Sequence, residues 1–288
     1  MPAEFFALAS AFFFAVNNIL MKKGLEYSNP PTAVLTSLAV NVIILWGFSL
    51  LFLPVSLLTL SGVLIFVIVG LFQPGLTRLL TFKSIKTVGV AITDPLRATT
   101  PMFSTFLAII LLGEQMTVTI FFSTSLIITG ITLLSLRGKV AAKIKKRYIL
   151  YPLLASFLGG LSQIMRKFGL SSVPHPVLAA AVTATSSLVV VTVIMWFSGQ
   201  RKMIQEMDRR FLPFYLAAGI SISLGMVAIY YALDLGKVVV VIPISSTGPL
   251  FSLSLTAIFL QGVERVTLKI VLGAILIISG VVLLTLWK

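Results

Sequence analysis

The stretch that decides the fold is "TDPLRATTPMFSTFLAIILL", residues 93–112. A helix needs about 20 mostly apolar residues to cross a bilayer, and this run has that length although it holds Asp94, Arg97 and two prolines. A charged residue near the middle of such a helix costs roughly 2.5–3.5 kcal/mol and almost always faces the interior of a bundle. The stretch therefore predicts a membrane-spanning helix with a polar face that the rest of the protein must accommodate.

The composition of the whole chain agrees with a membrane location. Of 288 residues, 58% are hydrophobic and 10% are charged, whereas a soluble domain has roughly 25% charged residues. The chain has no cysteine and one histidine, so we expect no metal and no cofactor. A membrane enzyme acting on lipids would need a nucleophile with its base, a metal cluster or an acidic motif, and none can be assembled, so we expect no enzyme.

Ten apolar runs are long enough to span the membrane. The sequence therefore predicts an all-α, multi-pass protein of the cell (plasma) membrane, with spans at residues 5–21, 33–53, 60–80, 88–112, 118–136, 149–166, 176–197, 211–233, 238–260 and 267–287.

The second half of the chain repeats the first. "DPLRATTPMFSTFLAII" (94–110) aligns with "IPISSTGPLFSLSLTAI" (242–258), and "IITGITLLSL" (127–136) aligns with "IISGVVLLTL" (277–286). "NNILMKKGL" (17–25) aligns with "SQIMRKFGL" (162–170). We expect five-helix repeats at 1–137 and 149–288, joined by a basic loop at 138–148. Because five is odd, the second repeat enters the membrane from the opposite side, which gives an inverted repeat whose substrate site lies between the halves.

The positive charge of the chain predicts its orientation. The net charge is +14, but the cations stand in short loops without interleaved aromatic residues, so we expect no nucleic-acid partner. The odd-numbered loops hold 16 Lys and Arg, whereas the even-numbered loops and the ends hold Arg166, Lys167, Lys237 and Lys288. The positive-inside rule then places the central loop in the cytoplasm and both termini outside.

The chain has two five-helix halves, and prolines recur in the fourth and ninth spans. These spans are followed by "LLGEQMT" and "QGVERVT", and the next spans end in "GITLL" and "GVVLL". This pattern resembles the drug/metabolite transporter superfamily, specifically its ten-span EamA-like family. The resemblance covers the whole chain. It implies a secondary carrier with a central cavity lined by helices one, three, four, six, eight and nine, typically an exporter of amino acids or other small metabolites. Asp94 and Arg97 depart from the small or apolar residues common there, and Ile242 and Ser245 are their counterparts in the second half.

Asp94 and Arg97 lie on one face of their helix because they are three residues apart. They could form an intrahelical ion pair that only supports packing. Alternatively, Arg97 binds a substrate carboxylate through paired hydrogen bonds, while Asp94 binds an amine or exchanges a proton. Together the two side chains suit a zwitterion such as an amino acid.

The repeated prolines predict polar backbone within the membrane. Pro95 and Pro101 in the fourth span, like Pro243 and Pro249 in the ninth, deprive the carbonyl four residues earlier of its usual donor. Broken helices at membrane depth are tolerated where they are buried in protein or line a wet cavity. A simple packing kink is the alternative for any one proline, but repetition in both halves favours the cavity.

Further polar side chains are candidates for the cavity lining or for interhelical contacts. Membrane amides often join helices, and aromatic residues near span ends often anchor at the interface. With these alternatives open, the remaining candidates for substrate binding are Asn17, Asn18, Gln73, Gln163, Tyr230, Ser245 and Ser246.

These features predict a secondary transporter that works by alternating access and exports a small polar or zwitterionic metabolite, an amino acid. Its partners would be that small molecule, the lipid bilayer and, if Asp94 couples transport, protons; the protein would be a monomer or a dimer. An exporter of lipophilic amines or cations, recognised by Asp94, is the alternative within transport. A non-transporting receptor or structural membrane protein is the alternative from another class.

Overall fold

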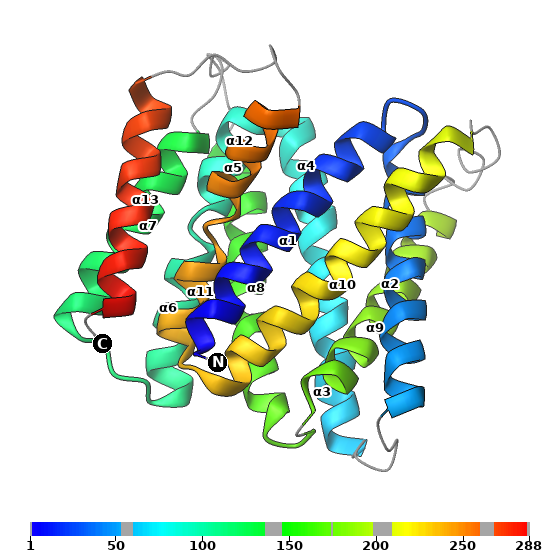
Figure 1. Cartoon of the computed structure of the whole chain (residues 1–288), viewed down its shortest axis with the longest axis horizontal. Coiled ribbons are helices and arrows are strands. Elements are labelled where there is room, and N and C mark those ends of the chain that lie inside the picture. The colour runs from blue at the N-terminus through cyan, green and yellow to red at the C-terminus, as the bar shows by residue number, and fades with distance from the viewer. Residues whose placement is uncertain are drawn as a thin grey trace.

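A computed structural model describes residues 2–52, 60–135, 146–173, 175–197, 209–259 and 268–286. The described residues form a bundle of helices without strands (Figure 1). Ten segments are long and apolar enough to cross a membrane, so the predicted all-α membrane fold is confirmed. The elements are α1 Ala3–Gly24, α2 Pro30–Phe52, α3 Leu60–Gly70, η2 Leu71–Leu76, α4 Thr77–Val88, α5 Val90–Arg97, α6 Thr100–Leu112, α7 Val118–Ser135, η3 Lys146–Ile149, α8 Leu150–Leu170, α9 Pro176–Phe197, η5 Arg209–Phe211, α10 Leu212–Leu235, α11 Val238–Ser245, α12 Gly248–Phe259 and α13 Leu268–Leu286.

Three of the ten described spans contain more than one α-helix. The third span is α3, η2 and α4, the fourth is α5 and α6, and the ninth is α11 and α12. The third span runs on to Val88, beyond the predicted end at residue 80. Gly89 alone joins it to α5, and its φ of +81° lies in a region that residues with a side chain rarely adopt.

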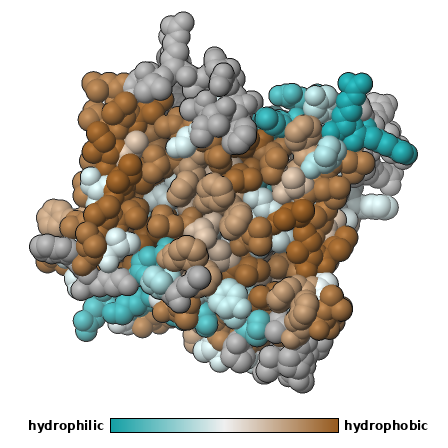
Figure 2. Space-filling view, viewed as in Figure 1, coloured by the Kyte–Doolittle hydropathy of each residue, from teal (hydrophilic) through white to brown (hydrophobic). Residues whose placement is uncertain are grey.

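Figure 1 shows the direction of the spans. α1 ends at the upper side of the view, and α2 ends at the lower side. The fourth span descends from α5 to α6, whereas the ninth ascends from α11 to α12. Hydrophobic side chains cover the middle of the face in Figure 2, and hydrophilic ones gather at its upper right and along its lower edge. This distribution fits a bilayer around the middle of the bundle.

Equivalent helices of the two halves make equivalent contacts. α1 packs along α10, and the matching pair, α8 with the third span, also packs together. α6 contacts α8 as α12 contacts α1, while α7 pairs with α13 and α2 with α9. This contact pattern fits the predicted two-fold repeat of the chain.

The α7–α13 pair brings two backbones into close contact. A Cβ on Gly130 would lie 2.6 Å from the Gly273 carbonyl oxygen, and one on Gly273 would lie 2.9 Å from the Gly130 oxygen. Small residues allow such an approach in membranes, where packing drives association. The fifth and tenth spans therefore hold the halves together at one edge.

Candidate functional site

The fourth and ninth spans break at equivalent places. α5 gives way to α6 at Ala98 and Thr99, and α11 gives way to α12 at Ser246 and Thr247, positions 148 residues apart. Each threonine hydroxyl donates to the carbonyl three residues earlier, at 2.6 Å for Thr99 and 2.8 Å for Thr247. These hydroxyls add donors to the backbone at the two breaks, and the Arg97 carbonyl, which Pro101 leaves without its amide donor, accepts from the Thr100 hydroxyl at 2.8 Å.

The third span has a break without a counterpart in the second half. Gln73 departs from helical geometry, with φ −134° and ψ 117°, immediately before Pro74. The corresponding eighth span, α10, is one continuous helix. Gln73 stands at the break and its side chain lines the cavity between the halves.

The described residues enclose a cavity of about 710 Å³ between the two halves. This volume lies within the range of roughly 300–1,000 Å³ that is usual for small-molecule sites. The six helices that the resemblance implied all contribute, and α2, α7 and α9 add Leu38, Ile131 and Ala184.

Most of the predicted site residues line this cavity, and four do not. The lining includes Asn18, Gln73, Asp94, Arg97, Gln163, Ser245, Ser246, Pro101 and Pro249. The structure places Asn17, Tyr230, Pro95 and Pro243 outside the lining. Tyr230 is fully buried, and its hydroxyl pairs with that of Thr183 at 2.6 Å. It therefore supports the wall of the cavity from behind.

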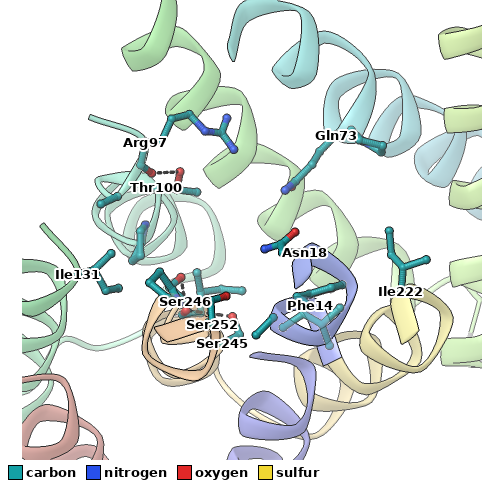
Figure 3. Close-up of a pocket in the computed structure, with 18 of the residues that line it drawn as sticks. Phe14, Asn18, Gln73, Arg97, Thr100, Ile131, Ile222, Ser245, Ser246 and Ser252 are labelled. Atoms are coloured by element: carbon teal, nitrogen blue, oxygen red, sulfur yellow. Dashed lines mark hydrogen bonds between the residues drawn. The ribbon is translucent and has the colours of Figure 1, made fainter. Parts of the chain in front are cut away.

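Polar side chains from three spans converge on the cavity. Figure 3 shows Arg97, Gln73 and Asn18 pointing toward a shared space. Asp94 is exposed and Arg97 is partly buried, and the Asp94 charge acts on the Arg97 guanidinium. Nη1 of Arg97 is buried without a hydrogen-bond partner among the described residues. Arg97 thus keeps a donor without a partner among the described residues.

The second half lines the opposite part of the cavity with less polarity. Ile242, the counterpart of Asp94, is 2% exposed. The hydroxyls of Ser245 and Ser246 both donate to the Ile242 carbonyl, at 3.0 and 2.8 Å. α10 adds the apolar side chains of Ile222 and Met226. The cavity therefore has a charged wall and an apolar wall.

Arg166 lines the cavity, although its place at the end of the sixth predicted span predicts a loop cation. It lies on α8, is only 7% exposed, and donates from Nη1 to Gln163 Oε1 at 3.2 Å. Gln163 Nε2 is 3.5 Å from Gln73 Oε1, and the Arg166 guanidinium lies 5.3 Å from the centre of the Tyr230 ring. The sequence held an indication of this role, because the repeat aligns Arg166 with the apolar Met21, so the charge is not a shared loop feature.

The lower end of the cavity is closed by packed side chains. Leu233, Val238, Val239 and Val241, around the α10–α11 junction, are all fully buried. At the upper end, the lining reaches Ser135, the last residue of α7, and the exposed Asp94. We therefore take the packed α10–α11 junction as the floor of the cavity and the side of the exposed Asp94 as its open side.

Two charged side chains secure this junction. Both carboxylate oxygens of Glu114 accept hydrogen bonds from the first backbone amides of α11, at 2.8 Å from Val238 and 2.9 Å from Val239. Lys167 Nζ donates to three carbonyls at the end of α10, including that of Leu233 at 2.6 Å. A carboxylate at a helix N-terminus and a cation at a C-terminus both complement the helix dipole.

A bundle of ten membrane helices, with a polar cavity between its halves and broken helices along its wall, defines a membrane transporter. The chain belongs to the EamA-like transporter family, whose model matches residues 1–136 and 146–286. It is therefore a multi-pass protein of the plasma membrane, and the members of its family are transporters rather than enzymes.

Individual proteins of similar sequence or fold are also known. The chain is 24% identical over 280 residues to an uncharacterized transporter of Archaeoglobus fulgidus, covering 97% of this chain and 96% of the relative. It is 36% identical over 78 residues to an uncharacterized protein of Methanocaldococcus jannaschii, matching 27% of this chain and 56% of that protein. One crystal structure superposes with a TM-score of 0.82 at 14% identity, covering 99% of this chain and 96% of that one. At that identity the likeness shows the fold alone.

Proposed function

We propose that this transporter exports a small zwitterionic metabolite, an amino acid, by alternating access. The observation that carries the proposal is the presence of both Arg97 and Asp94 on the wall of a cavity of about 710 Å³ between the halves. Arg97 has an unpartnered buried donor for a carboxylate, and Asp94 offers a negative charge for an ammonium group. The apolar wall formed by α10 would accept the side chain of the substrate.

Alternating access requires a cavity that is closed at one end and can be closed at the other. The packed floor at the α10–α11 junction supplies one closed end. The equivalent junction at the upper side, between α4 and α5, would close in the alternate state. With the predicted orientation the structure corresponds to a cytoplasm-facing state, in which a substrate for export loads.

Proton coupling through Asp94 is part of the proposal. Asp94 is the acidic residue that lines the cavity among the described residues, and it is exposed enough to exchange protons with water. A carboxylate that alternates between pairing with an amine and carrying a proton can link the two fluxes.

The proposal is tested by flux measurements in vesicles that contain the purified protein. Wild-type protein should exchange at least one radiolabelled amino acid, and Arg97→Ala should lower that flux by about 30-fold or more, because losing one partner of a buried charged pair costs roughly 2–5 kcal/mol. Lys86→Ala is the matched control: it also removes a cation, but from an exposed position on α4 outside the cavity lining.

Two results would contradict the proposed function. One is transport of lipophilic cations such as tetraphenylphosphonium without transport of any amino acid. The other is a flux through folded Arg97→Ala protein equal to that of the Lys86→Ala control.

A further inference from the structure

Arg166 is a buried cation at the floor of the cavity. It lies one residue before Lys167, whose ammonium group holds the end of α10, and it stands over Tyr230 at the edge of the packed floor. Asp94 lines the cavity from α5 and is exposed, so Arg166 is a buried charge of the lining and Asp94 an exposed one. The floor therefore carries a charge of its own.

The side chain of Arg166 is fixed in place, but its hydrogen-bonding capacity is not used up. Gln163 accepts from Nη1, and the Tyr230 ring supports the guanidinium plane. Tyr230 is in turn held by Thr183. Nε of Arg166 is nevertheless buried without a hydrogen-bond partner among the described residues. Guanidinium groups present their donors in a fork that matches a carboxylate.

The charges that line the cavity do not balance. Among the described lining residues, Arg97 and Arg166 are positive and Asp94 is negative. Removing an unpaired charge from water is costly, and a buried guanidinium is stabilised by an anionic partner. A purely structural role for Arg166 would account for the contacts with Gln163 and Tyr230, but it leaves the extra charge and the unpartnered donor without a reason.

We infer that Arg166 forms a second anion subsite and that the transported molecule is an acidic amino acid, with two carboxylates and one amine. This inference rests on the proposed function and names its substrate class. One carboxylate binds Arg97, the amine binds Asp94, and the second carboxylate binds Arg166 at the floor. Gln163 positions Arg166 and, with Gln73, supplies amide groups beside this subsite.

Wild-type protein alone provides the first test. Glutamate and glutamine have nearly the same shape but differ in the second negative charge. In competition with a labelled amino acid, glutamate should be preferred over glutamine by about tenfold or more, and aspartate over asparagine likewise, because a charge-assisted pair is lost with each amide. A preference for the amides would overturn the inference while leaving the proposed function standing. Transport of no amino acid at all would overturn both.

Substitution of Arg166 provides the second test. Arg166→Met should reduce the glutamate-to-glutamine preference to about one, and Arg166→Lys should restore part of it because a positive charge returns. Lys86→Met is the matched control, since it removes a cation outside the lining. An unchanged preference in folded Arg166→Met protein would show that Arg166 only supports the wall. If that variant does not fold, the wild-type comparison and Arg166→Lys decide.

Discussion

The fourth and ninth spans are built alike but line the cavity differently. The fourth span breaks at residues 98–99 and the ninth at the equivalent residues 246–247. In each, the threonine of the break donates its hydroxyl to the carbonyl three residues earlier, that of Leu96 or Ile244. Yet the fourth span presents Asp94 and Arg97 to the cavity, whereas Ile242 is buried and Ser245 bonds to its own backbone. The shared features set the mechanics of the helices, and the differences set the chemistry of the cavity.

The α10–α11 junction and its equivalent in the first half also differ in their charged side chains. The α10–α11 junction is held by Glu114 and Lys167. In the first half, Lys22, the counterpart of Lys167, is exposed, and Glu264, the counterpart of Glu114, lies outside the described residues. In this structure Lys167 is therefore hydrogen-bonded at the α10–α11 junction, whereas its counterpart Lys22 is exposed.

The largest effect should come from making the fourth span more like the ninth. Asp94→Asn keeps the shape of the side chain but makes it uncharged, like its counterpart Ile242. Accumulation driven by a pH gradient should be lost entirely, because the neutral amide cannot carry a proton, while exchange without a gradient should continue at a reduced rate, because the substrate amine loses its charged partner but keeps an amide oxygen. The measurement is uptake of labelled substrate with and without an imposed pH gradient. Gradient-driven accumulation at the wild-type level would exclude Asp94 as the coupling group.

A smaller effect should come from the edge where the halves meet. Gly130→Val would place a Cβ 2.6 Å from the Gly273 carbonyl oxygen, and overpacking of this kind typically costs roughly 1–3 kcal/mol. The melting temperature in detergent should fall. Gly47→Val is the matched control, because a Cβ there meets nothing within 4 Å. Equal melting temperatures for the two variants would refute the close approach of α7 and α13.

The smallest effect should come from the secured junction. Glu114→Gln removes the negative charge at the start of α11 but keeps a carbonyl oxygen, and a lost cap costs about 1 kcal/mol. Because the chain has no cysteine, a single Val241→Cys provides a clean reporter of opening at the floor. Its rate of modification by a water-soluble thiol reagent should rise several-fold with Glu114→Gln. An unchanged rate would mean that Glu114 does not hold the floor closed.

The sequence was sufficient for the spans and for the breaks in the fourth and ninth helices, because length, hydropathy and proline act locally. Pro101 removes an amide donor wherever the chain folds, and the Arg97 carbonyl accordingly accepts from the Thr100 hydroxyl instead (Figure 3). Most lining residues were also predictable, since Asn18, Gln73 and Gln163 are polar groups within apolar runs.

Features that depend on tertiary packing were not predictable. The irregular backbone at Gln73 has no counterpart in α10, so the repeat gave no indication of it. Arg166 lies four residues before the end of α8, where a cation usually extends to the interface, and only the neighbouring helices show that it is enclosed. Its pairing with Met21 in the repeat is the same kind of asymmetry that singled out Arg97.

The imbalance of charge along the cavity makes the empty protein sensitive to voltage. Two arginines and one aspartate leave the described lining with one net positive charge, and a charge that crosses the full membrane field changes energy by about 2.3 kcal/mol per 100 mV. A negative cytoplasm would hold the unloaded cavity in the cytoplasm-facing state. A bound acidic amino acid cancels that charge, so the loaded protein would switch with little influence from the membrane potential.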